Sequence, residues 1–452
     1  MPRTATSLVR KFAVGLSVAV GGYAIILGLL LTPSVQRFAI YAHRINTLFL
    51  GDDLNVSEAF GFAKHQVTPF NLQTPDGETL YAWHVLPLDI YTRHEKALRE
   101  ESRPYGPVDD FTKTSAFARL TGNDPSPARV VVTCTEKVIL SYFLRPQANL
   151  QVHGNAGHVA QGWRTDTYRM LASQPNTHVL TIDYRGFGYS TGSPTEAGLI
   201  TDGTTLVEWV MKVAGIPPDR IVIIGQSLGT AVSSAVALHF ADPGSELIPS
   251  ETRELWPSSG QRIPTAFLGI VLVAPFSSLP SLMLTYRIGG VLPILLPLRP
   301  FPYIAGILTS RMPDKWLSAD RLSAYYGAFS GSLQVLSSTE GRSIGSLQII
   351  HSVRDMDIPY HQTEMICRRI FREGSEPGVY EGTEAEGRLR CIDGSRGPGA
   401  QDVKEKGRPK VRFEIVEYGG EYLENFLSRL FALLTGHQGT IESLRILLLL
   451  RQ

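Results

Sequence analysis

Cysteine and net charge are both scarce in this sequence, and each shortage excludes a class of protein. Only three cysteines occur, Cys134, Cys367 and Cys391, too few and too widely spaced for a disulfide framework or a zinc site. The 43 lysines and arginines nearly balance 42 aspartates and glutamates. A chain without a basic excess has no general attraction for nucleic acid, so we expect no nucleic-acid partner. At 452 residues it can bury a large core.

One uncharged, mostly apolar run stands near the N-terminus, at residues 12–32. As a helix it would be about 31 Å long, enough to cross a bilayer. Arg3, Arg10 and Lys11 precede it, and the positive-inside rule then predicts a short cytosolic tail over residues 1–11. The rest of the chain would lie in the lumen of the endoplasmic reticulum or outside the cell. A cleaved signal peptide and a buried core helix are the alternatives.

The most informative motif is Gly225-Gln226-Ser227-Leu228-Gly229. A β-branched run, 221–224, precedes it, and a small-residue helical segment, 231–239, follows. Strand, sharp turn and helix in this order indicate a nucleophile elbow, although a plain Gly/Ser turn has the same letters. We therefore predict Ser227 as a catalytic nucleophile. The backbone N–H of Leu228 would be one donor of the oxyanion hole.

A second oxyanion donor is expected after an early strand, in a His-Gly type of turn. The segment His153-Gly154-Asn155-Ala156-Gly157 stands at that place, ahead of a helical stretch. Asn155 is the predicted donor and Ala156 the alternative. An ordinary strand-to-helix turn is the structural interpretation of the same residues.

The acid of a Ser-Asp-His triad in this order should follow a later strand. Asp355 comes just after a strand that ends at His351. There its carboxylate can reach a histidine and fix the tautomer of the ring. Asp357 is the rival, and a solvated acidic loop is the non-catalytic alternative.

Strands and helices alternate along the chain, which favours an α/β fold with a mostly parallel sheet and helices on both faces. The expected strands cover residues 65–72, 78–85, 130–133, 178–184, 221–224, 268–274, 347–351 and 410–417. Residues 89–127 are charged and aperiodic, and we expect a surface insertion there. Residues 371–409, rich in glycine and charge, are expected to form a flexible loop.

Four segments together resemble a known family: His153–Gly157, Asp183–Gly188, Gly225–Gly229 and the Asp355 loop. They are similar to the membrane-anchored α/β-hydrolases of the monoacylglycerol and lysophospholipid lipase group, the relatives of α/β-hydrolase domain-containing protein twelve, including fungal ones. The resemblance covers about residues 60–420. It implies an α/β-hydrolase fold, serine hydrolysis of lipid acyl esters at the membrane, and no cofactor. The Asp183 turn would be structural.

The sequence departs from that family at the catalytic base. A histidine is expected directly after the last strand, but Glu421 follows Gly420, and residues 421–452 form a divergent tail. His437 is the candidate base, with a surface histidine as the alternative. His361 also follows Asp355, but it begins a helix too close to it.

A second departure lies upstream, where residues 134–151 separate the strand 130–133 from the His153 turn. Both departures suit translated intron sequence, which is a hypothesis about the gene. In that case the protein would be a catalytically impaired hydrolase fold. A serine peptidase of the same fold is a further alternative to the lipid esterase.

Residues 276–317 lie between the elbow and the acid and are apolar and rich in proline. The prolines make a straight transmembrane helix unfavourable. We expect a lid over the acyl site, because a lipid tail needs an apolar wall. Plain core packing is the alternative.

Overall fold

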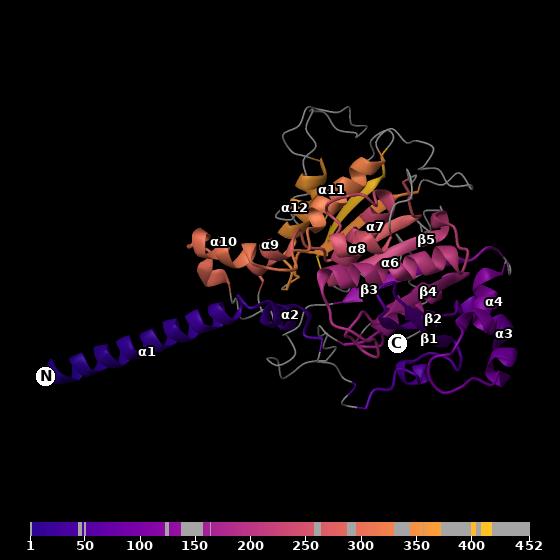
Figure 1. Ribbon diagram of the computed structural model, residues 1–452, viewed down its shortest axis with the longest axis horizontal. Coiled ribbons are helices and arrows are strands. Elements are labelled where there is room, and N and C mark those ends of the chain that lie inside the picture. Colours follow the sequence, from indigo (N-terminus) through magenta and orange to yellow (C-terminus); the bar gives the residue numbers. More distant parts are fainter. Residues whose placement is uncertain are drawn as a thin grey trace.

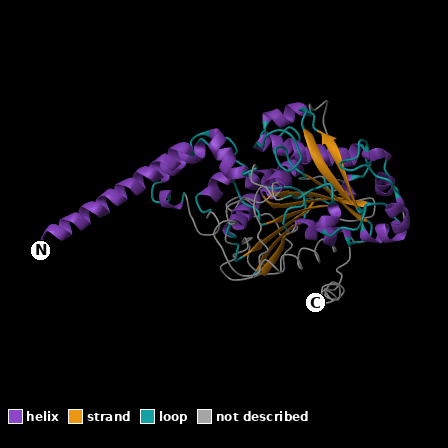
Figure 2. Cartoon of the chain, turned by 90° about the horizontal axis from the view of Figure 1, so that it is seen from below, coloured by secondary structure: helices purple, strands orange, loops and turns teal. Residues whose placement is uncertain are grey.

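The computed structural model describes residues 2–43, 48, 51–122, 126–136, 157–162, 164–256, 264–286, 295–329, 344–355, 357–371, 399–403 and 408–417. Their centre is a twisted sheet in the strand order β1-β2-β4-β3-β5-β6-β7-β9-β8, with helices packed around it (Figures 1 and 2). The strands are β1 Val67–Gln73, β2 Thr79–Val85, β3 Arg129–Glu136, β4 Thr177–Ile182, β5 Ile221–Ser227, β6 Gly269–Val273, β7 Ser346–Ser352, β8 Gly399–Val403 and β9 Val411–Val416.

Six neighbouring strands of this sheet, from β4 to β9, run parallel, and β1, β2 and β8 pair antiparallel at the two ends. The predicted α/β fold with a mostly parallel sheet is therefore confirmed. The middle strands are buried on both sides, because their sequences are continuous runs of valine, isoleucine and leucine.

The helices supply the layers around the sheet. They are α1 Pro2–Leu29, α2 Pro33–Tyr41, α3 Leu88–Glu100, α4 Ser115–Thr121, α5 Arg164–Ala172, α6 Glu196–Lys212, α7 Leu228–Ala241, α8 Ser250–Leu255, α9 Leu279–Met283, α10 Pro302–Ser310, α11 Ser318–Ala328 and α12 His361–Phe371. Helix α7 is buried along its whole length. It packs on β3, β5 and β6 and lies between α6 and α11, which explains its small side chains.

Three expectations need correction. The predicted surface insertion at 89–127 contains two helices, α3 and α4, and α3 buries Ile90, Tyr91 and Leu98 on one face. The end of the predicted flexible loop forms the edge strand β8, while residues 372–398 lie outside the described residues. The strand expected at 130–133 continues to Glu136 and so includes the start of the 134–151 segment. Residues 137–151 lie outside the described part.

Helix α1 projects away from the body of the molecule (Figure 1). Its residues Arg10–Leu29 have a mean hydropathy of 2.1 and are long and apolar enough to cross a membrane. Helix α2 follows and is joined to the body by a buried polar cluster. Asp314 accepts hydrogen bonds from the Tyr41 hydroxyl (3.0 Å) and from Arg37 Nε (3.2 Å), and Trp316 Nε1 donates to the Tyr41 hydroxyl (3.2 Å).

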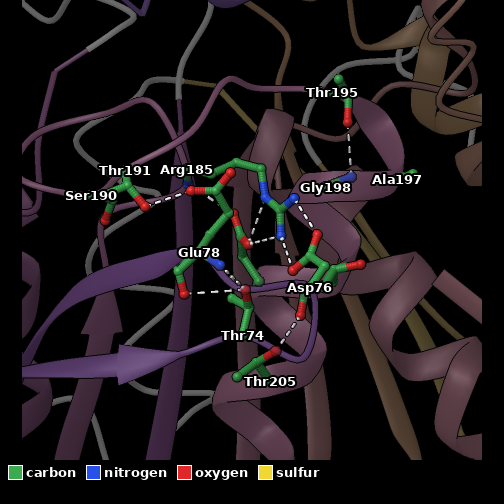
Figure 3. A network of polar contacts seen from close by, with 12 residues as sticks. Thr74, Asp76, Glu78, Arg185, Ser190, Thr191, Thr195, Ala197, Gly198 and Thr205 are labelled. Carbon is green, nitrogen blue, oxygen red and sulfur yellow. Dashed lines mark hydrogen bonds and ion pairs between the residues drawn. The ribbon is translucent and has the colours of Figure 1, made fainter. Parts of the chain in front are cut away.

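A second polar cluster holds the turn that follows β4 (Figure 3). The Arg185 guanidinium donates to both carboxylate oxygens of Asp76, at 2.6 and 3.0 Å, and to Asp202 Oδ1 through Nε at 2.9 Å. Asp202 Oδ2 also accepts the backbone N–H of Arg185 at 2.8 Å. Arg185 thus ties the β1–β2 turn and helix α6 to the turn that begins at Asp183.

Candidate active site

Ser227 occupies a strained position between β5 and α7. Its backbone φ is +51° and ψ is −119°, a region that non-glycine residues rarely adopt. A Cβ on Gly225 would lie 2.4 Å from the Gly229 carbonyl oxygen and 2.6 Å from Ser233 Oγ. Glycine at 225 is therefore what lets the strand and the helix approach. This backbone is that of a nucleophile elbow.

The Ser227 hydroxyl is buried, with 2% of the residue exposed, and its Oγ has no hydrogen-bond partner among the described residues. Leu228 is the first residue of α7. The first amides of a helix have no intrahelical acceptor, and together they form the positive end of the helix dipole. The N–H of Leu228 is thus suited to stabilise negative charge next to Ser227.

The other predicted oxyanion residues, Asn155 and Ala156, lie outside the described residues. The chain directly after them is held by Asp183, whose Oδ1 accepts the N–H of Val159 at 2.5 Å. Asp183 Oδ2 accepts the N–H of Tyr189 at 3.2 Å. Burial raises the pKa of Asp183 to about 7, although these two amides and the charge of Arg164 oppose the shift.

His158, also in this segment, is buried beside Asp52, with 3.5 Å between Nε2 and Oδ2. Burial and the charge of Arg164 lower the pKa of His158 to about 4, and Asp52 opposes them. Arg164 Nη1 in turn donates to the His158 carbonyl oxygen at 2.5 Å. Hydrogen bonds from the Asp183 side and from Arg164 therefore hold residues 158 and 159 in place.

Asp355 lies in the loop after β7. Gln226, Val273 and Ile350 pair in one row across β5, β6 and β7, so Ser227 and the Asp355 loop emerge at the same edge of the sheet. Asp355 Oδ1 accepts the N–H groups of Asp357 at 3.0 Å and Ile358 at 2.9 Å. These two bonds orient the Asp355 carboxylate.

Tyr286 lies three residues after α9 and is buried. Its pKa is raised by burial and then by the charges of Asp357 and Asp355. The sequence contained no signal for this neighbour, because the two segments are far apart along the chain. The same holds for the bond between Asp183 and Val159.

Two histidines near the acid have other roles. His351 is fully buried, and burial lowers its pKa. Its Nε2 donates to the Ile358 carbonyl oxygen and its Nδ1 accepts from the Thr363 hydroxyl, both at 2.7 Å. His361 begins α12, and burial lowers its pKa, as does the charge of Arg299. Neither donates to or accepts from Ser227.

The predicted base, His437, lies outside the described residues, as does everything after Glu417. The end of β9 is nevertheless informative, because Ile415 pairs with His351 and Val416 with Ser352. Ser352 Oγ donates to the Glu417 carbonyl oxygen at 3.1 Å. The chain therefore leaves β9 beside the Asp355 loop, where a triad histidine belongs.

Comparison with known proteins agrees with this geometry. Residues 152–360 match the model of the alpha/beta hydrolase family. The chain is 37% identical over 207 residues to the protein Bem46 of Schizosaccharomyces pombe, which covers 44% of this chain and 66% of Bem46. It is 43% identical over 93 residues to human ABHD12B, covering 21% of this chain and 25% of the relative.

A third relative is the lysophosphatidylserine lipase ABHD12 of Danio rerio, 40% identical over 95 residues, which cover 21% of this chain and 24% of ABHD12. The chain thus spans two thirds or less of each of these relatives. A solved alpha-beta hydrolase from Vibrio vulnificus aligns over 89% of this chain and 93% of its own at 12% identity, with a TM-score of 0.43.

The sheet, the strained serine and the family match show an α/β-hydrolase fold. Within that class, the chain is similar to ABHD12 and Bem46, as the sequence motifs predicted.

Proposed function

We propose that the chain is a membrane-anchored serine hydrolase that cleaves an acyl ester of a lipid such as a monoacylglycerol or a lysophospholipid. The observation that carries the proposal is Ser227, with its positive φ at the β5–α7 junction and its buried, unpartnered hydroxyl among the described residues. The name of the lipase ABHD12 supports a lysophospholipid as the substrate class.

In the proposed reaction, Ser227 Oγ attacks the ester carbonyl carbon while a histidine base takes the hydroxyl proton. The Leu228 N–H, with that of Asn155, stabilises the oxyanion. Asp355 orients the base and stabilises its charged form. The bond to the alcohol then breaks, and the alcohol leaves with the proton from the base. Water attacks the acyl-enzyme and releases the fatty acid.

Residues 276–317 would cover the acyl site in this proposal. Tyr286 supports it, because the charges of Asp355 and Asp357 act on its hydroxyl. A hydrolase fold without a working base remains the second candidate. It is favoured by Glu421, which stands where the family motif would continue with histidine.

The proposed anchor is the apolar part of α1, with the hydrolase body in the lumen or outside the cell. Arg10 and Lys11, at the N-terminal side of that stretch, support a cytosolic N-terminus. Cys367 is disulfide-bonded, and disulfides persist in oxidising compartments. Protection of the body from protease in sealed microsomes is the expected result. Digestion would contradict the orientation but not the anchor.

A fluorophosphonate probe tests the chemistry, since it reacts only with an activated serine. The full chain in microsomes should be labelled, and Ser227→Ala should lose labelling and esterase turnover by about 10³-fold or more. Ser173→Ala, an exposed serine after α5, is the matched control and should keep both. Equal labelling of the Ser227→Ala variant would refute the nucleophile. A folded but unlabelled wild-type chain would favour the impaired hydrolase.

A further inference from the structure

The anchor helix contacts the body of the protein through a second, small apolar cluster. Leu298, Ala305 and Leu308 form its buried part. Tyr23, Leu27 and Leu31 of the anchor region pack against it, together with Leu284 and Leu295. Helix α10 therefore lies along the C-terminal part of α1, on the side of the body from which α1 emerges (Figure 1).

The outward surface of α10 is apolar and uncovered. Tyr303 is 81% exposed, Phe301 56%, Ile304 43% and Ile307 37%. The helix has no charged residue, and the exposed Arg299 and Arg311 stand just outside its two ends. An apolar helix bordered by arginines suits a position among lipid chains with the guanidinium groups at the phosphates.

The contact with the anchor sets the depth of α10. Tyr23 precedes Leu29, the end of α1, by six residues, which at the rise of an α-helix is about 9 Å. If Arg10–Leu29 spans the bilayer, Tyr23 lies about 9 Å inside the membrane from the Leu29 end. The apolar cluster that packs against Tyr23 then extends to the same depth. Interfacial helices bury their apolar face by about 5–10 Å.

Two features fix the position of the body relative to α1. The linker between α1 and α2 is short, and α2 is joined to the body by the Asp314 cluster with Arg37 and Tyr41. The Glu196 carboxylate extends that cluster, because it accepts the N–H groups of Lys315 at 2.6 Å and Trp316 at 3.0 Å. The anchor thus holds α10 at a fixed depth in the membrane.

We propose that α10 is a second membrane contact, seated in the leaflet that holds the C-terminal end of α1, with Phe301, Tyr303, Ile304 and Ile307 among the lipids. This rests on the anchor proposed above. Its consequence is a short route for substrate. Leu284 packs in the cluster at the anchor. Tyr286, two residues further along the chain, is close enough to Asp355 for the charge of that carboxylate to help raise the tyrosine pKa. Lipid would therefore enter from the bilayer at this side.

An environment-sensitive NBD label at single introduced cysteines tests the contact in the full chain, reconstituted in phosphatidylcholine vesicles with nitroxide-carrying lipids. The sites are Tyr303→Cys in α10, Leu16→Cys in α1, and Val213→Cys as an aqueous control. Val213 is 47% exposed and follows the last residue of α6, about 25 Å along the helix from Glu196. The chain without an introduced cysteine gives the background.

The expected result is blue-shifted, nitroxide-quenched emission at positions 303 and 16 and unquenched emission at 213. Quenching at 16 without quenching at 303 would overturn the α10 contact and leave the anchor intact. A blue shift at 303 without quenching would mean that protein covers α10, and would also overturn it. Absence of quenching at both 16 and 303 would refute the anchor and the contact together. None of these readouts depends on catalytic activity.

Discussion

Glu136, the last residue of β3, pairs with Ser227, the last residue of β5. If residues 134–151 are translated intron sequence and the chain is made without them, then Val152, His153 and Gly154 would take the places of Cys134, Thr135 and Glu136. Gly154 would then stand opposite Ser227, with Asn155 directly beyond it. That is where an oxyanion donor must lie.

Deleting residues 134–151 should therefore improve the oxyanion hole rather than destroy the sheet. We expect the deleted chain to fold and, in a background with a working base, to turn over ester at least about 10²-fold faster, the value of one oxyanion donor. Folding is checked by a cooperative thermal transition. A deleted chain that folds but gains no activity would contradict the altered register.

The two acids of the β7 loop should differ in their effect on catalysis. Asp355→Asn should lower kcat by about 10⁴-fold in an active chain, because the histidine would lose its fixed tautomer. Asp357→Asn should have a small effect, since Asp357 offers its backbone N–H to Asp355 in either form. Steady-state kinetics on a short soluble ester measure both. The reverse order would make Asp357 the catalytic acid.

We expect opposite effects on stability from two glycine substitutions, one in the elbow and one in α11. Gly225→Ala places a Cβ 2.4 Å from the Gly229 carbonyl oxygen, and it should destabilise the fold by about 1–3 kcal/mol or more. Gly327→Ala, in α11, meets no atom within 4 Å and should stabilise it by about 0.5–1 kcal/mol. Denaturant titrations of the detergent-solubilised chain compare them. Equal stability would mean that β5 and α7 are less close than described.

Asp183 should make stability fall as pH rises. Its folded pKa of about 7 lies above 3.8, the usual pKa of an aspartate side chain, so the folded state binds more protons between these values and loses stability with increasing pH. Relative to Asp183→Asn, the wild type should lose at most about 1.4 kcal/mol per pH unit across that window.

Asp76→Asn is the control with the opposite sign. Burial would raise the Asp76 pKa, but hydrogen bonds from Arg185 outweigh it, so the pKa is lowered. The stability that Asp76 contributes is therefore present above its unfolded pKa and is lost as pH falls through the folded pKa. Unfolding free energies at several pH values test both. A pH-independent difference for Asp183→Asn would show that Asp183 is not charged differently in the two states.

What the sequence predicted well is local. The run Ile221–Ile224, the glycines around Ser227 and the small residues of α7 lie next to one another in the chain, so spacing alone indicates the elbow. The continuous apolar strands likewise predicted the parallel sheet. The helices α3 and α4 were missed because their charged surface hides a narrow apolar face, of which Ile90, Tyr91 and Leu98 are the buried part in α3.

The rest depends on contacts between distant segments. No spacing rule brings Tyr286 to the Asp355 loop, Asp183 to Val159, or Tyr23 of the anchor to α10. Each of these pairs is set by how helices pack around the sheet, and the residues carry no motif. The candidate site could therefore be named at Ser227 and Asp355 from sequence, while the groups that position it could not.

The base is the last open member of the proposed triad. The chain leaves β9 beside the Asp355 loop, so we expect a histidine placed directly after Gly420 to reach Ser227, whereas His437 comes 17 residues after Gly420 in the chain. We expect His437→Ala to change little. Replacing Glu421 and the following residues by a tail that begins with histidine should create or raise fluorophosphonate labelling. The same tail beginning with glutamine is the matched control, because it keeps the length and removes the base. A wild-type chain that labels strongly and loses labelling in His437→Ala would instead make His437 the base and residues 421–452 a working part of the enzyme.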